Sequence, residues 1–522
     1  MLRRNVWSLG MAVLALTLVA PKVWADGGSE REEFHEDRPP EEIEEFDFIG
    51  YYFMRHEASN IAPTNEFLKG QIVGRFFGGN TTRTTSEKTS RFTEQRFMPM
   101  ITYSPRLFDG WAKIRTSLEF DWTWGDANYG AGGNFGGAFG ADTVNMQTQN
   151  LFMEIRPTKT FVLNMGLLRL YDNVQVPWYT FTDHLLQKGY RLSMFGSDAT
   201  GVGAHWFFRT DQRIKLGAYQ LYENNVEQRD DVALFEVDYE RDLAIDTSVG
   251  LSVHYLMDRG NGEGGVSILG QGLSSGLSNY NGVFNFDLGG QRYKGDIFWL
   301  GTHFHRDPLL QQGRLGWSGF AWWNGGTVRT DTRDVDINGV AANLRVAARW
   351  GALSEDQVVF DGVFTTGDDD NTADGTYSGV LTGNNWTSPG AVFIGHPLYL
   401  LLPHGDVVNR FNAAVMDIQN IGYGVQAGAL SVAKELVPNK WRVKAAVGHG
   451  RSTADPDGGG STIGTEFNAS LRWTMRVFLE AELHAAYLSL GDFYDSPVVN
   501  GGVDERPDDP WTVFASLKWI MF

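Results

Sequence analysis

The sequence predicts an all-β protein, a transmembrane antiparallel β-barrel of about 18 strands with short periplasmic turns and long extracellular loops. Three observations support this prediction. Long segments alternate strictly between apolar and polar residues, short and long connections alternate between those segments, and the amino terminus has the pattern of an export signal.

The clearest alternating segment is residues 111–124, WAKIRTSLEFDWTW. Its even-numbered residues are mostly apolar, whereas Lys113, Arg115, Glu119 and Asp121 lie between them. A period of two predicts a strand with one apolar face and one charged face. Its length fits a membrane-crossing strand, which needs about 10 residues and carries aromatic residues at the membrane interface. A soluble sandwich strand is the alternative, but such strands usually have about 5–6 residues.

The first 25 residues have the pattern of a secretory signal peptide. Two arginines precede an apolar run over residues 6–20, and the small residues Val23 and Ala25 fit a cleavage site after Ala25. A membrane anchor is the alternative, but the run is shorter than the roughly 20 apolar residues of a spanning helix. No later segment of the sequence is long and apolar enough to form one, so the exported chain is either a soluble protein or a barrel.

Composition favours the barrel, with 62 glycines, 17 tryptophans and 13% aromatic residues. The chain has no cysteine, which excludes disulfides, thiolate metal sites and covalently bound haem. The net charge of −19 argues against a nucleic-acid partner. Residues 26–45 are dense in carboxylates and contain Pro39-Pro40, which predicts a disordered periplasmic tail. Docking of this tail to a periplasmic partner is an alternative.

Connections of two kinds separate the strand-like segments, which become regular from about residue 67. The short ones are residues 105–110, 157–159, 210–212, 240–242, 306–312, 351–355, 436–439 and 474–475. The long ones are residues 78–90, 125–144, 171–199, 223–229, 259–290, 324–339, 367–419, 452–462 and 491–510. This asymmetry is typical of outer-membrane barrels, and the loop count implies about 18 strands within a barrel spanning residues 46–522. Barrels of this size enclose an aqueous channel.

Residues 46–55, FDFIGYYFMR, do not fit this count. An additional strand there would give an odd number and separate the two chain ends across the membrane. We therefore expect this segment to be a plug or a periplasmic segment. In the alternative it is a true barrel strand, and one of the later predicted strands is wrong.

Charged residues in the alternating segments are expected to face the lumen, because a charge facing lipid near mid-membrane costs roughly 2–4 kcal/mol. Fixed lumen charges set the ion preference of a pore. In the alternative interpretation they pair across strands and hold the wall together. The pore-lining candidates are Lys113, Arg115, Glu119, Asp121, Arg213, Lys215, Arg345, Arg349, Arg442, Lys444, Arg472, Glu480 and Glu482.

Loop 367–419 is the longest connection and has two parts. Asp368, Asp370 and Asp374 are spaced for a loose calcium site at most, because the twelfth position that an EF-hand fills with glutamate is Leu381. The later part is rich in proline and large apolar residues, so we expect it to pack, and folding into the pore as a constriction is one way to do so. On another segment, His303 and His305 share one strand face, either as metal ligands or as interface or pore histidines.

Two stretches resemble the alginate-export family of outer-membrane porins. They are QNLFMEIRPTKTFVLNMGLLRLYDN at residues 149–173 and TTGDDDNTADG at residues 365–375. The resemblance implies an 18-stranded barrel that moves sugars or other small hydrophilic solutes. It also implies that Arg169 is a pore arginine.

These features predict an outer-membrane channel of a Gram-negative bacterium, for passive passage or export of hydrophilic solutes such as saccharides or small ions. Its expected partners are outer-membrane lipid and those solutes, with no cofactor, no metal and no enzymatic activity. A sheath for a partner protein is the alternative. A lipid hydrolase is a weaker one, because it needs serine, histidine and an acid on adjacent outward positions, whereas His254 and His484 are phased inward.

Overall fold

The computed structural model describes residues 45–63, 73–75, 82–124, 145–169, 198–223, 228, 230–261, 288, 291–308, 310–353, 355–381, 396–408, 411–416, 418–502 and 505–521. The predicted signal peptide, and the tail as far as residue 44, lie outside this part of the chain. No helix among the described residues is both long and apolar enough to cross a membrane.

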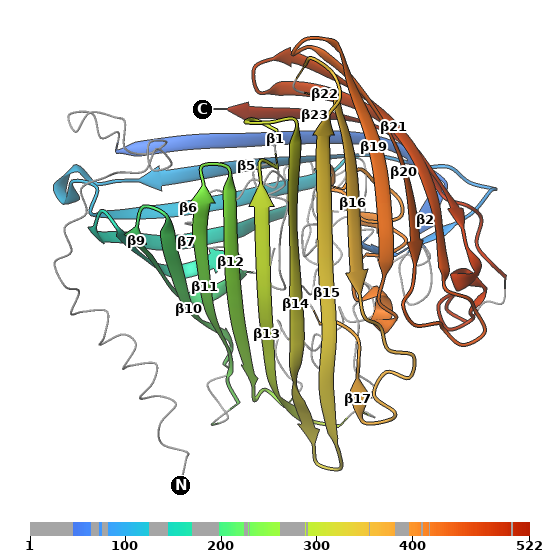
Figure 1. Ribbon diagram of the computed structural model, residues 1–522, viewed down its shortest axis with the longest axis horizontal. Helices are drawn as coiled ribbons and strands as arrows, with labels where there is room; N and C mark the ends of the chain where they lie inside the picture. Colours follow the sequence, from blue (N-terminus) through green and yellow to red (C-terminus); the bar gives the residue numbers. More distant parts are fainter. Residues whose placement is uncertain are drawn as a thin grey trace.

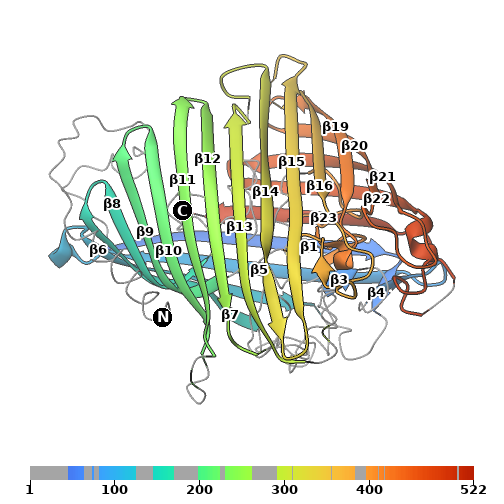
Figure 2. The ribbon, with the colours of Figure 1, turned by 60° about the horizontal axis from the view of Figure 1, so that its bottom comes forward.

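In the described residues, a closed antiparallel barrel of 18 strands confirms the predicted fold class. Each strand pairs with its neighbours in the sequence, and the sheet closes because β1 pairs with both β5 and β23, as Figures 1 and 2 show. The barrel strands are β1 (Phe46–Ser59), β5 (Ser90–Tyr103), β6 (Ala112–Thr123), β7 (Asn145–Thr158), β8 (Phe161–Arg169), β9 (Asp198–Arg209), β10 (Gln212–Tyr222), β11 (Val232–Ala244), β12 (Thr247–Asp258), β13 (Tyr293–Arg306), β14 (Leu315–Thr330), β15 (Asp334–Arg349), β16 (Gln357–Thr365), β19 (Gln426–Val437), β20 (Trp441–Arg451), β21 (Thr462–Arg476), β22 (Leu479–Leu490) and β23 (Trp511–Met521).

The remaining elements are short and lie in the connections. They are β2 (Ile61–Pro63), β3 (Val73–Arg75), β4 (Thr82–Thr84), η1 (Arg106–Phe108), β17 (Thr376–Tyr377), β18 (Phe411–Ala413), η3 (Asn420–Gly422) and η4 (Asp492–Asp495). Apart from the β14–β15 connection, the short and long connections alternate as predicted. All the other short turns therefore lie at one end of the barrel, here called the short-turn end, together with the start of β1 and the end of β23.

The first barrel strand is not the predicted one. Residues 46–59 form β1, which pairs with Tyr103 to Ser90 on one side and Met521 to Thr512 on the other. The strand expected from about residue 67 is wrong, because Val73–Arg75 forms β3 and pairs with β18 of the longest loop instead. The period of two is hidden in the first half of β1, where aromatic residues occupy both faces.

The predicted loop at residues 324–339 is also wrong. Strands β14 and β15 stay paired through this stretch, from Asn324 with Gly339 to Arg329 with Asp334, and only residues 331–333 form the turn. Val335 and Ile337 are buried, whereas the alternate residues Asp334 and Asp336 are exposed. Buried and exposed residues therefore still alternate along the hairpin. The exposed ones are polar residues of the kind that loops contain, which is why this stretch was predicted to be a loop.

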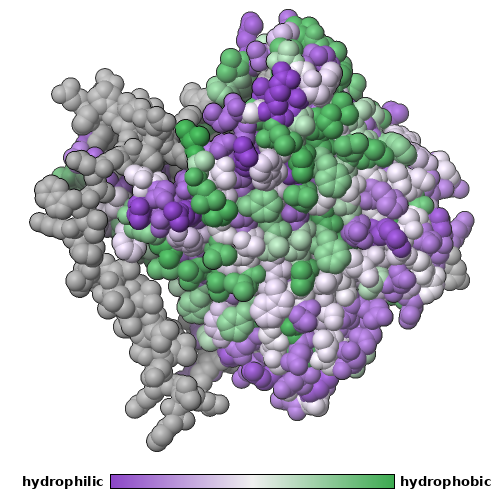
Figure 3. Space-filling model, in the orientation of Figure 1, coloured by the Kyte–Doolittle hydropathy of each residue, from purple (hydrophilic) through white to green (hydrophobic). Residues whose placement is uncertain are grey.

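The barrel wall separates an apolar exterior from a polar interior. Outward residues such as Ile114 and Leu344 are 48% and 45% exposed, whereas the inward residues Arg115 and Asp121 are 5% and 0% exposed. Figure 3 shows apolar side chains gathered across the middle and top of one face, with hydrophilic ones at the lower edge, where the β14–β15 hairpin lies in Figure 1. This arrangement is that of a transmembrane barrel.

Candidate channel and its inner loop

The charged candidates whose side chains the structure describes lie on the inner face of the wall, where most pair across neighbouring strands. Arg115 Nε lies 2.7 Å from a Glu154 carboxylate oxygen, and Arg345 Nη1 lies 3.0 Å from Asp361 Oδ1. Arg213 contacts both Glu240 and Asp242, and Lys215 Nζ lies 2.6 Å from Glu236 Oε1. Each of these cations has a carboxylate of a neighbouring strand beside it. The contacts therefore agree with the alternative interpretation, in which the lumen charges pair across strands and hold the wall together.

At the short-turn end, a carboxylate from a turn joins two of the pore-lining candidates, Arg442 and Arg472. Glu355 Oε2 lies 2.9 Å from both Arg442 Nη1 and Arg472 Nη2, and Glu480 lies 3.9 Å from Arg472. Glu355 was not predicted to lie at this site, because residues 351–355 were predicted only to form a short turn. A carboxylate shared by two guanidinium groups reduces their mutual repulsion.

The other candidates have more varied surroundings. Glu119 and Asp121 each lie 2.8 Å from Arg96 Nη2. Lys113 is half-buried, and Arg349 donates to the carbonyl of Leu310. Lys444 Nζ lies 5.8 Å above the Tyr399 ring, and Glu482 lies 3.5 Å from His484. Arg169 ends β8, where it pairs with Asp198, and its side chain lies outside the described part of the structure.

Several interior charges were missed by the sequence reasoning. Arg55 lies 2.7 Å from Glu94 and 3.2 Å from Glu57, and was missed because its segment was not expected to be a strand. Glu94 and Arg96 share the inward face of β5, but the exposed Arg91 has the opposite phase, so the charges of this strand do not by themselves define its facing.

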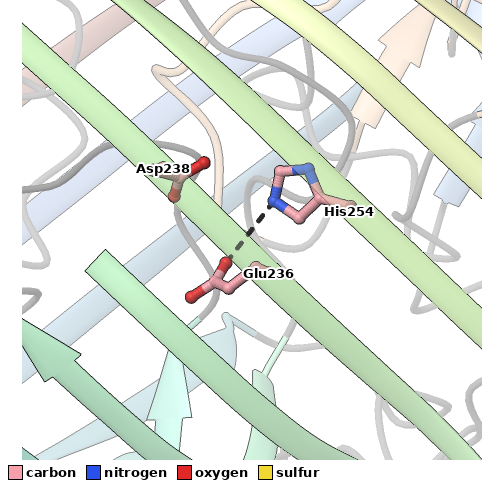
Figure 4. A group of neighbouring side chains, drawn as sticks. All are labelled: Glu236, Asp238 and His254. Atoms are coloured by element: carbon pink, nitrogen blue, oxygen red, sulfur yellow. Dashed lines mark ion pairs between the residues drawn. The ribbon is translucent and has the colours of Figure 1, made fainter. Parts of the chain in front are cut away.

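A fully buried cluster of Glu236, Asp238 and His254 lies on the inner face of β11 and β12 (Figure 4). His254 Nε2 lies 3.4 Å from Glu236 Oε2, and the ligand atoms of all three residues lie within 4.8 Å of one another. Carboxylate and imidazole groups at this spacing could ligate a divalent metal. However, the Lys215 ammonium already contacts Glu236 and lies 3.9 Å from Asp238, so it supplies the positive charge that an ion would bring.

The predicted histidine pair has a related arrangement. His303 is 1% exposed, and its Nε2 atom lies 3.3 Å from Glu240 Oε2. Gly250 faces it, and a Cβ atom there would lie 2.2 Å from the His303 ring. His305 follows on the same inward face of β13. His303 therefore packs into the wall as part of the ionic network.

Part of the longest loop lies inside the barrel, against the inner faces of its strands. We call residues 396–408 the inner loop. The Glu466 carboxylate of β21 accepts hydrogen bonds from the amides of Tyr399, Leu400 and Leu401, at 2.8, 2.9 and 2.7 Å. Leu398 and Leu400–Leu402 are buried, so the expectation that this apolar stretch packs is met.

A second attachment holds the other end of the inner loop to β5 and β23. Glu94 accepts a hydrogen bond from the Val408 amide at 3.0 Å, and Arg96 donates one to the Val408 carbonyl at 2.9 Å. Lys518 Nζ lies 2.5 Å from Asp406 Oδ1. Although burial favours the neutral acid, Lys518, His484 and His404 together hold the pKa of Asp406 below its usual value.

Glycines on β20 provide the space for the inner loop. A Cβ atom on Gly448 would lie 2.6 Å from Leu398 Cδ2, and one on Gly450 would lie 3.1 Å from Leu401 Cδ1. The inner loop therefore crosses the inner faces of adjacent strands from β20 and β21 to β23 and β5. Tyr399 also packs edge-on against His484 and Phe514, with ring centroids 4.9 and 5.5 Å away.

Histidine protonation bears on the docking of the inner loop. His396 Nε2 lies 2.7 Å from the Pro403 carbonyl oxygen, and His396 Nδ1 accepts from the Leu398 amide at 3.2 Å. These contacts define a neutral imidazole with its proton on Nε2. Burial lowers the pKa of His396 to about 4, with lesser contributions from Lys444 and Arg345.

No protein-family model matches the chain, and no curated protein sequence matches it significantly. The structure of Acinetobacter baumannii OccAB4 covers 93% of this chain and 100% of its own, at 10% identity and a TM-score of 0.46. Pseudomonas aeruginosa OpdK with vanillate covers 91% and 98%, at 10% identity and a TM-score of 0.47. Pseudomonas aeruginosa OprD covers 91% and 95%, at 10% identity and a TM-score of 0.46.

At this identity the similarities concern the fold alone. No comparison confirms the resemblance of residues 149–173 and 365–375 to the alginate-export family. A pore role for Arg169, which that resemblance implied, stays a prediction.

Proposed function

We propose that this protein is a channel of the Gram-negative outer membrane for passive passage of hydrophilic solutes, with the inner loop narrowing the path. The observation that supports this most strongly is the reversal of polarity across a closed wall. Ionised residues pair on the inside of the barrel, while the outside exposes leucine, valine and aromatic side chains. Such a wall is stable only with lipid outside and a polar interior.

The solute path in this proposal follows the wall from β15 to β23. The Arg345, Arg442 and Arg472 side chains there are 20–22% exposed. In contrast, Lys215 and Glu236 on β10 and β11 are 2% and 0% exposed. The charges on the β15–β23 wall can therefore meet a passing solute, whereas those on the β10–β11 wall support the barrel.

The geometry favours a channel over the two alternatives. A sheath for a partner protein needs a free bore, but the inner loop covers the inner faces of β20, β21 and β5. A lipid hydrolase needs serine, histidine and an acid together on the outer face. His254 and His484 are 0% and 1% exposed and face inward. The exposed His56 and His449 each contact a threonine hydroxyl rather than a serine. We assign the chain no enzymatic activity.

Liposome swelling tests the proposal. Liposomes containing the purified protein should swell in isotonic solutions of a small saccharide and not in those of a large dextran. An Arg345→Gln/Arg442→Gln variant should change the relative rates for charged solutes and leave that for a neutral sugar nearly unchanged. Impermeability to every small solute would contradict the channel.

A further inference from the structure

Two adjacent hairpins at the short-turn end carry apolar side chains at their tips, where water-exposed turns are ordinarily polar. Leu436 is 58% exposed at the tip of β19–β20, and Val477 and Phe478 are 77% and 51% exposed at the tip of β21–β22. We call these residues, with Val437, Lys440, Trp441, Trp473 and Arg476, the double-hairpin patch.

The two tips form one continuous surface. Trp441 and Trp473 are register partners, and their rings stack with centroids 5.4 Å apart and planes 5° apart. The Thr474 amide donates to the Lys440 carbonyl at 2.9 Å, which joins the hairpins beyond the last ladder pair. Along the same strands, exposed Leu430, Phe467 and Leu483 continue the apolar surface toward the middle of the wall.

Backbone conformation adds a second observation. Phe478 has φ of +64°, in the left-handed region that favours glycine or asparagine, whereas the neighbouring hairpin has Asn439 there, with φ of +54°. A bulky ring in this conformation is unfavourable in a turn that only has to reverse the chain. Contact of the ring with lipid would offset this cost.

The charge exposed on the patch is positive. Lys440 and Arg476 are both exposed. The carboxylates of the same strands are directed elsewhere, because Glu435 is buried and accepts from the Asn439 amide, and Glu480 lies beside Arg472 and Thr474. Apolar tips, stacked tryptophans and two flanking cations together resemble the anchors that proteins place at an anionic lipid surface.

We propose that the double-hairpin patch inserts its apolar tips into the inner leaflet and binds the phosphate of an anionic phospholipid between Lys440 and Arg476. This assignment rests on the proposed membrane location of the barrel. Phospholipid with an anionic headgroup fits better than a zwitterionic one, because each cation near an anionic surface adds affinity.

The chain offers a matched control at another short turn. Arg209 at the β9–β10 tip lies 3.4 Å from Asp211, which also lies 3.5 Å from Arg241 of β11, so a carboxylate already stands beside these exposed cations. An Arg209→Gln change removes the same kind of exposed cation from a turn that carries a carboxylate.

Native mass spectrometry of the full-length protein, released from nanodiscs with equal phosphatidylglycerol and phosphatidylethanolamine, tests the proposal. The wild type and Arg209→Gln should retain phosphatidylglycerol preferentially. Lys440→Gln/Arg476→Gln should reduce that preference about thirtyfold, from about 1 kcal/mol for each cation. Val477→Ser/Phe478→Asn should reduce retention of both lipids.

An unchanged lipid ratio in the double cation variant, with the barrel folded by circular dichroism, would overturn the proposal. An equal loss in Arg209→Gln would also overturn it, because the preference would then follow net charge rather than this patch. Solute permeability of the same samples is measured separately, so a failed channel assignment is distinguishable from a failed lipid site.

Discussion

The Glu466 carboxylate accepts a hydrogen bond from the Leu401 amide at 2.7 Å, inside the barrel and across 65 residues of sequence. The same carboxylate accepts hydrogen bonds from the amides of Tyr399 and Leu400 and from the Asn468 side chain. A carboxylate on the wall therefore accepts hydrogen bonds from backbone donors of a loop that crosses the lumen. This contact determines where the inner loop lies.

A Glu466→Gln variant should release the inner loop. The neutral amide replaces charge-assisted bonds and turns one acceptor oxygen into a donor, which should cost about 2 kcal/mol of docking free energy. The expected result is faster proteolysis of the inner loop and a larger single-channel conductance. Glu480→Gln, at the short-turn end, is the control for docking and should leave proteolysis of the inner loop unchanged.

A Gly448→Val variant should displace the inner loop by steric conflict. Its Cβ atom would lie 2.6 Å from Leu398 Cδ2, closer than side-chain atoms pack. The additional change Leu398→Ala should restore docking, measured as protection from proteolysis. Gly428→Ala is the control, because a Cβ atom there meets Phe360 at an ordinary 3.6 Å. Equal protection in Gly448→Val and the wild type would contradict the packing described.

A Glu355→Gln variant should lower thermal stability slightly and increase the preference for anions. Glu355 lies 2.9 Å from both Arg442 and Arg472, which would then lose a shared carboxylate. Since Glu355 is 33% exposed, solvent screening limits the expected loss to about 1 kcal/mol. Thermal unfolding and reversal potentials in a salt gradient measure the two effects. A stability loss with unchanged selectivity would mean that these arginines do not meet permeating ions.

Acidification should weaken docking of the inner loop through His396. Burial lowers the pKa of this histidine to about 4, whereas an exposed histidine titrates near 6.5. The undocked state thus binds more protons, so docking is fully favourable above about pH 6.5. It should weaken as the pH falls toward 4, by about tenfold per pH unit. Conductance should rise over this range, and His396→Gln should remove that part of the rise. An identical pH response in both proteins would exclude His396 as the cause.

The sequence predicted the barrel and the inward facing of many charged residues. In strands such as β6, β15 and β20, only one of the two possible orientations keeps the charged side chains away from lipid, where burying an ion is costly. The sequence did not predict β1, because aromatic residues occupy both faces in the first half of that strand. It also did not predict the outer half of the β14–β15 hairpin, because the exposed side chains there are polar, like those of a loop. The attachment of Glu466 to the inner loop was not predictable, because no local pattern specifies which backbone amides a distant carboxylate meets.

Single-channel recording of the purified protein in a planar bilayer is the most direct test of a closed barrel with a polar interior narrowed by its own loop. The wild type should give discrete current steps, and Glu466→Gln should give larger ones. Absence of current from both proteins, when each is folded and inserted, would contradict the account.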